Sequence, residues 1–274
     1  SAILRLRSGC SSGQAPKNSA GCARFDGLDV LAASEAEMRG IRGRKMAMIF
    51  QNPRAALNPI RKIGRQLEDV LLRHTKTRRR DIKKRALACL EQVRIPDAAR
   101  RYHAYPFELS GGQCQRVMIA LAIAAEPALL IADEPTTGLD VTTQAVVMDL
   151  IRDLVHRNRM AAILITHDLA LASESCDRIV VMHAGHVVET APTRALFVSP
   201  RHPYTARLIG ATPHDCVDVR ALASIPGALP DLRATALPPC RFSLRCDYYT
   251  LTCDRSLSQT LLNDNHVVAC HFPL

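Results

Sequence analysis

A short apolar run that ends in two adjacent carboxylates constrains the fold of this chain most strongly. Residues 128–132 (ALLIA) lie between Pro127 and Asp133-Glu134, a pattern typical of a strand buried in a parallel sheet. A helix is predicted over 141–158, and a second buried strand over 161–166 (AAILIT). Because strands and helices alternate, the sequence predicts an α/β sheet domain.

The remaining segments extend this pattern. We predict strands at 23–25, before a turn at Asp26-Gly27, and at 45–50, with mostly helical structure over 55–125. Residues 178–183 and 186–189 flank Ala184-Gly185 and predict a β-hairpin. Pro-rich sequence after about residue 205 ends the alternation. We therefore expect a domain at 1–205, with a helical subdomain at about 55–125, and an extension at 206–274.

The net charge of +10 allows two interpretations. Basic residues concentrate at 39–45 and 73–85, and clustered cations can bind nucleic-acid phosphates. The second cluster alternates with Ile82, Ala86 and Leu90 at helical spacing, without aromatic residues that could stack on bases. This pattern favours the solvated face of an amphipathic helix, which can lie near anionic lipid headgroups.

The chain has no apparent membrane or export signal. Its longest strongly apolar run, 117–125, is shorter than the about 20 residues that cross a bilayer. Residues 1–7 lack the apolar core of a secretory signal. We therefore expect a soluble, cytoplasmic chain.

Three groups of residues have the chemistry of a phosphate site. Asp133 at the C-terminal end of a strand can hold Mg²⁺, and Glu134 beside it can polarise a water molecule. Residues 110–113 (SGGQ) precede an apolar helix, and such a loop presents backbone N–H groups to phosphate oxygens. A helix N-cap would explain Ser110 but not the following Gly-Gly-Gln. His167 follows the strand at 161–166 and can donate a hydrogen bond to phosphate.

The order of these segments resembles the ATP-binding-cassette (ABC) ATPases. LSGGQ (109–113), LLIADEP (129–135), GLD (138–140) and ITHD (165–168) look like the signature, Walker B, D-loop and H-loop of that family. FQNP (50–53) resembles its Q-loop. The resemblance implies a P-loop NTPase-like nucleotide-binding domain with a helical subdomain, which binds ATP and Mg²⁺. Gly138 departs from the Ala that is commoner in the D-loop.

The resemblance also implies a role for each matching residue. Asp133 would hold Mg²⁺, Glu134 would be the catalytic base, and His167 would contact the γ-phosphate. Gln51 would sense Mg²⁺ and the attacking water and link them to the membrane partner. The residues that would close over ATP on the opposite subunit of a dimer, or cross that interface, are Ser110, Gly111, Gly112, Gln113 and Asp140.

One motif of this family, G-x-x-x-x-G-K-S/T (Walker A), is missing from the sequence. No Gly-Lys pair occurs in the chain, and residues 8–13 (SGCSSG) lack the Lys. In this family that Lys lies about fifty residues before the Q-loop Gln, at or just before Ser1. We expect a truncation, and the alternative is a divergent, catalytically impaired subunit. Either way, ATPase activity of this chain alone is in doubt.

Several further segments resemble the branch of this family that imports dipeptides, oligopeptides or nickel: QNP (51–53) with LNP (57–59), HPYT (202–205) and IPG (225–227). That branch has a Cys-rich C-terminal extension, and Cys240, Cys246, Cys253 and Cys270 match it. Four thiolates can hold a 4Fe–4S cluster, although their spacing fits no standard zinc or ferredoxin pattern. Zinc, or four unligated thiols, are the alternatives.

The resemblance predicts an importer motor on the cytoplasmic face of the inner membrane, with peptides or nickel as the solute. Its partners would be a second ABC ATPase, two permease subunits and, indirectly, an extracytoplasmic binding protein, with no nucleic acid. A non-transport cassette protein acting on DNA or ribosomes would predict coiled-coil insertions or a second cassette, and this chain has neither. A non-hydrolysing partner subunit, or an inactive fragment, is the remaining alternative.

Overall fold

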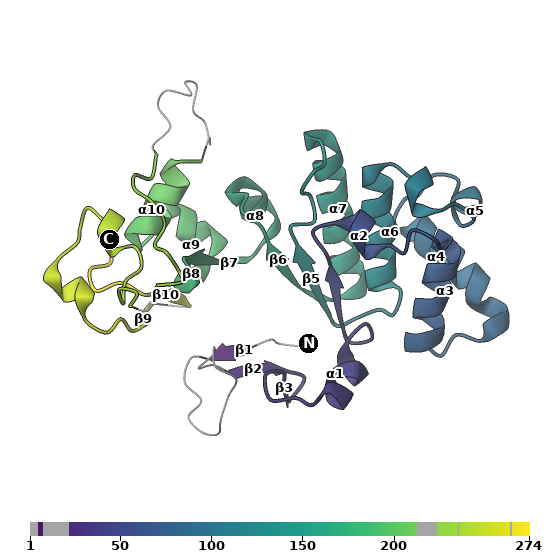
Figure 1. The fold of residues 1–274 in the computed structure, drawn as a ribbon, viewed down its shortest axis with the longest axis horizontal. Coiled ribbons are helices and arrows are strands. Elements are labelled where there is room, and N and C mark those ends of the chain that lie inside the picture. The colour runs from purple at the N-terminus through teal and green to yellow at the C-terminus, as the bar shows by residue number, and fades with distance from the viewer. Residues whose placement is uncertain (1–4, 8–21, 213–223, 235, 264) are drawn as a thin grey trace. The chain divides into compact units, whose positions relative to one another are not determined.

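The computed structural model describes residues 5–7, 22–212, 224–234, 236–263 and 265–274 (Figure 1). The Gly-rich segment 8–13 lies outside these residues. The chain forms two compact units, residues 1–166 and 167–274.

A parallel sheet is the centre of the first unit. Its strand order is β4 (Met46–Ile49), β5 (Leu129–Asp133) and β6 (Ala161–Ile165). Helix α7 (Val141–Asn158) connects β5 to β6 and matches the predicted helix. The strands predicted at 45–50, 128–132 and 161–166 are therefore confirmed, but the predicted burial of the strand at 161–166 is wrong. No residue of β6 is buried, because β6 is the edge strand of this sheet among the described residues.

A small antiparallel sheet and one helix lie against this sheet. Strands β1 (Arg5–Arg7), β2 (Cys22–Phe25) and β3 (Leu28–Asp29) pair in that order, and α1 (Glu35–Ile41) follows. Asp26 and Gly27 form the predicted turn with φ of 50° and 85°, as tight hairpin turns require. Phe25 and Ile41 bury their side chains together with Leu129 of β5. These contacts join the small sheet to the central one.

The predicted helical segment is confirmed. It consists of α2 (Pro53–Ala56), α3 (Ile63–His74), α4 (Ile82–Gln92), α5 (Ala98–Arg101) and α6 (Gly111–Ile123), with single turns at Arg79–Asp81 and Pro106–Glu108. Ile82, Ala86 and Leu90 of α4 are buried, whereas the cations at 83–85 are exposed. The basic cluster is thus the solvated face of an amphipathic helix.

The second unit is built on an antiparallel sheet of order β7-β8-β10-β9. The hairpin of β7 (Arg178–His183) and β8 (His186–Pro192) is confirmed, and β8 continues past the predicted end at Glu189. Strands β9 (Thr260–Asn263) and β10 (His266–Val268) come from the end of the chain, and β10 pairs with β8. The other elements are α8 (Leu169–Ser175), α9 (Thr193–Val198), α10 (Pro203–Gly210) and short turns at Ser243–Arg245 and Leu251–Asp254.

In the part of the chain that the structure describes, no helix is both long enough and apolar enough to cross a bilayer.

Candidate functional site

The carboxylate of Glu134 is held by two side chains at the C-terminal edge of the parallel sheet. Gln51, just past β4, donates from Nε2 to Oε2 of Glu134 at 2.7 Å. Thr137 donates its hydroxyl to the same oxygen at 2.8 Å. The Glu134 amide donates to the carbonyl of Ile165 at 2.9 Å, which ties the residue to the end of β6. The carboxylate therefore has a defined direction at the edge where ligands of parallel sheets bind.

The backbone at Glu134 is unusual for a residue with a side chain. Its φ is +43°, in the left-handed region that few non-glycine residues occupy. Such conformations cost on the order of 1–3 kcal/mol and concentrate at active sites, where a side chain must point in a required direction. Asp133, the last residue of β5, pairs in register with Ile165 and is half-buried.

The site residues predicted from the Q-loop, Walker B and H-loop segments do not all belong to the same unit. Gln51, Asp133 and Glu134 lie together in the first unit. His167 is exposed and is the first residue of the second unit, two positions after the end of β6. Thr137 was not predicted as a site residue. The feature of the sequence that could have indicated it is a hydroxyl side chain three residues after Glu134.

The loop at 110–113 is a helix N-terminus closed by a reciprocal cap. Ser110 accepts a hydrogen bond from the Gln113 amide at 3.3 Å, and the Gln113 side chain accepts one from the Ser110 amide at 3.1 Å. The prediction that a cap would explain only the serine is therefore wrong, because the capping box also engages the glutamine. The cap engages the Gln113 amide, so Gly111 and Gly112 are the first-turn positions of α6 whose amides it leaves to an anion.

The N-termini of α6 and α7 lie next to each other. A Cβ on Gly112 would lie 2.8 Å from the methyl carbon of Thr143, so the approach of the two helices leaves no room for a side chain there. Asp140 caps α7 by accepting from the amide and the hydroxyl of Thr143 at 2.9 and 2.7 Å. The hydrogen bonds from Thr143 lower the pKa of Asp140, so this residue is an anion at neutral pH. Gly138 has φ of +76°, which favours glycine over alanine at this position.

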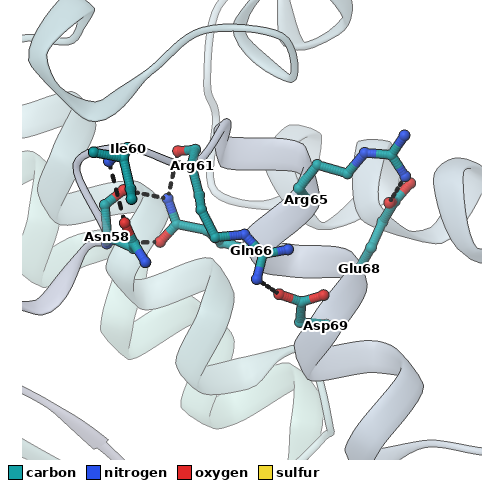
Figure 2. A network of polar contacts seen from close by, with 7 residues as sticks. All are labelled: Asn58, Ile60, Arg61, Arg65, Gln66, Glu68 and Asp69. Atoms are coloured by element: carbon teal, nitrogen blue, oxygen red, sulfur yellow. Dashed lines mark hydrogen bonds and ion pairs between the residues drawn. The ribbon is translucent and has the colours of Figure 1, made fainter.

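Figure 2 shows the polar network that shapes the loop after Gln51. Gln66 of α3 is buried, and its amide accepts from the Asn58 N–H at 2.9 Å and donates to the carbonyls of Asn58 and Arg61 at 3.0 and 2.8 Å. Arg61 in turn pairs with Asp69 at 2.6 Å. Gln66 was not predicted from the sequence, in which its only signal was a polar residue on the same helix as the apolar positions Ile63 and Leu67.

The four C-terminal cysteines line one cavity but do not form a metal site in the structure. Its volume of about 10 Å³ is close to that of one water-sized probe. Among the described residues, no three or more His, Cys, Asp or Glu side chains are arranged to hold a metal ion. Burial raises the pKa of the Cys240, Cys246 and Cys270 thiols. The predicted 4Fe–4S cluster, and the zinc alternative, therefore find no support here.

The fold is that of an ABC nucleotide-binding domain, as its similarity to known proteins shows. Residues 11–137 match the ABC transporter family, and residues 188–253 match the C-terminal region of oligopeptide/dipeptide transporters. The ATP-binding cassette MJ0796, solved as a dimer in a post-hydrolysis state bound to ADP and Pi, superposes with a TM-score of 0.58 at 29% identity. That match covers 66% of this chain and 76% of the cassette.

Two curated relatives identify the branch. The dipeptide transport ATP-binding protein DppD of Escherichia coli K12 is 45% identical over 251 residues, which are 91% of this chain and 76% of DppD. DppD of Bacillus subtilis 168 is 42% identical over 247 residues, covering 90% of this chain and 73% of that protein. The chain belongs to the ABC transporter ATP-binding subunits of the dipeptide/oligopeptide importer type.

Proposed function

We propose that this chain binds ATP and contributes to its hydrolysis in order to drive peptide uptake through partner permeases. The observation that carries the proposal is the hydrogen bond from Gln51 to Glu134, which joins two predicted catalytic residues 83 positions apart in the sequence. Residues of this kind, at the C-terminal edge of a parallel sheet, fit the chemistry of nucleoside triphosphate hydrolysis.

Each carboxylate has a distinct proposed task. Asp133 would hold Mg²⁺, which polarises the phosphate oxygens when bound. Mg²⁺ in phosphate sites takes one or two carboxylates and completes its shell with water and substrate oxygens, so this donor set fits. Glu134 would accept a proton from the attacking water, and Gln51 and Thr137 would orient its carboxylate for that step. His167 would donate a hydrogen bond to the γ-phosphate.

The capped N-terminus of α6 would act on ATP held by another subunit. Ser110, Gly111, Gly112 and Gln113 would present amide and hydroxyl donors to its phosphates, and Asp140 would cross the subunit interface. Support comes from the close approach of the two helix N-termini, which brings these donors and Asp140 onto one surface, and from the dimeric state of the solved cassette MJ0796.

The remaining assignments extend the importer model to partners and location. A second ABC ATPase would complete the dimer, and two permeases would receive the motion on the cytoplasmic face of the membrane. A binding protein outside the membrane would deliver the peptide, or nickel in the alternative assignment. Residues 1–205 would form the ATPase domain, whose Q-loop and helical segment 55–105 would face the permease, and 206–274 the importer-type extension.

Adding a Walker A motif tests whether this chain is a hydrolysing subunit or a non-hydrolysing partner subunit. A chimera that carries the Walker A segment of E. coli DppD in front of this chain would supply the lysine of that motif. We expect this chimera to hydrolyse ATP, and the Glu134→Gln substitution to lower its kcat by at least about a hundredfold, because a general base contributes about 10²–10⁴-fold.

The control for this experiment is Glu174→Gln, which neutralises an exposed carboxylate of α8. We expect it to leave kcat unchanged. ATP binding by the chimera without hydrolysis would favour the non-hydrolysing subunit, and hydrolysis that is indifferent to Glu134→Gln would refute the proposed catalytic role.

A further inference from the structure

A basic cavity of the helical segment lies outside all the motifs discussed above. It opens between α3, α4 and the residues that follow α5, with a volume of about 230 Å³. The residues that line it are Lys62, Arg65, Glu68, Lys83, Tyr102 and His103.

The floor of this cavity is rigid and almost completely buried. The Tyr102 ring is 4% exposed and packs directly on Gly64, where an added Cβ would lie 2.3 Å from the ring. The Tyr102 hydroxyl donates to Oε1 of Glu68, and burial together with this hydrogen bond raises the pKa of Tyr102 to about 12. The phenol therefore stays neutral and keeps its position at any physiological pH.

Glu68, the one carboxylate among the described residues that line the cavity, is already engaged. Oε2 of Glu68 accepts from Arg65 at 2.7 Å, as Figure 2 shows, while Oε1 accepts from Tyr102. Arg65 uses one N–H of its guanidinium for this pair, which leaves its other N–H donors available. Glu68 thus orients the guanidinium of Arg65 and leaves N–H donors of Arg65 available in the cavity.

Lys62 and Lys83, the other two cations of the cavity, have no acidic partner among the described residues. In the described part of the chain, no carboxylate lies within 4.0 Å of the ammonium groups of Lys62 or Lys83. Each ammonium lies over an aromatic ring, Lys83 at 5.5 Å from the centroid of Tyr102 and Lys62 at 5.8 Å from that of Tyr105. These contacts direct the two lysines without neutralising their charge.

We propose that this cavity binds a phosphate monoester dianion. Three cationic side chains against one carboxylate leave two excess positive charges, which a dianion neutralises. A planar guanidinium fixed by Glu68, with two ammonium groups around the same space, suits the several acceptor oxygens of a phosphate. The volume admits a phosphoryl group with a small substituent. The same chemistry occurs in soluble phosphorylated metabolites and in the headgroup of phosphatidic acid.

Two matched variants test this inference. Lys62→Ala/Lys83→Ala removes both unpaired cations of the cavity. Lys76→Ala/Lys84→Ala removes the same charge from exposed positions of the same segment that do not line the cavity. Calorimetric titration of the purified chain with inorganic phosphate, at constant ionic strength, measures the soluble arm. Cosedimentation with phosphatidylcholine vesicles containing about 20 mol% phosphatidic acid measures the lipid arm.

The inference predicts that the cavity variant weakens binding about tenfold or more in at least one arm, whereas the control variant changes it less than about twofold. Loss in the phosphate titration alone assigns a soluble ligand, and loss in the vesicle assay alone assigns a lipid headgroup. Equal weakening by both variants, or no binding in either arm, overturns the inference. It is also overturned if succinate binds as tightly as phosphate, since the cavity would then suit a carboxylate of a protein partner.

Discussion

Removal of the Glu189 side chain should destabilise the second unit strongly. Glu189 lies on β8 with an exposed fraction of 0%. Its carboxylate accepts the backbone N–H groups of Arg201 and His202 at 2.7 and 2.9 Å. It also accepts the ring N–H of His266, from β10, at 2.7 Å. One buried side chain therefore connects the hairpin, the segment before α10 and strand β10.

The loss in the free energy of unfolding can be estimated from the three hydrogen-bond donors that Glu189→Ala would leave without an acceptor. Each buried donor without a partner costs about 1–3 kcal/mol. Since the three bonds share one carboxylate and are not additive, we expect a loss of about 3–5 kcal/mol in the free energy of unfolding of this unit.

Native-state hydrogen exchange measures this loss at the strand amides of β8 and β10. A change of about 3 kcal/mol accelerates their exchange by about a hundredfold. Glu189→Gln keeps one carbonyl acceptor but places an amide N–H against a donor, and should give an intermediate acceleration. Glu174→Ala, at an exposed position of the same unit, is the control. If Glu189→Ala changes exchange no more than this control, Glu189 does not hold these donors and the reasoning is refuted.

Two further substitutions test the packing of Gly64 and the titration of His202. Gly64→Ala should lower the free energy of unfolding by about 1–3 kcal/mol, because the new Cβ would lie 2.3 Å from the Tyr102 ring. Urea unfolding measures this loss, and an unfolding midpoint equal to that of the wild type would contradict the packing of Tyr102 on Gly64. His202 has its pKa lowered from 6.5 to about 4, chiefly by burial, with Glu189 opposing the shift. Its neutral form is favoured in the folded state, so the stability it contributes is present above pH 6.5 and is lost as the pH falls toward 4. His202→Asn keeps an acceptor for the Tyr204 amide that His202 caps at 3.0 Å, and should give a flatter stability profile between pH 6.5 and 4; an unchanged profile would exclude His202 as the titrating group.

Much of the fold and most of the candidate site follow from the sequence by itself. The apolar runs around 46–49, 129–133 and 161–165 predict the strands because strand formation follows a local pattern of residues. The carboxylates of Asp133 and Glu134 then fall at a strand end by simple counting. The motif order indicates the family without any knowledge of contacts.

Tertiary structure decided which of these residues meet and what surrounds them. Gln51 and Glu134 come together only because β4 and β5 are neighbours in register, and β6 is exposed only because it is an edge strand. The Tyr102–Glu68 pair spans 34 residues and involves no motif. Such contacts between distant residues depend on how helices and strands pack, whereas sequence periodicity reports only which face of each element is apolar. For that reason the sequence predicts the candidate catalytic motifs, whereas the basic cavity can be recognised only in the tertiary structure.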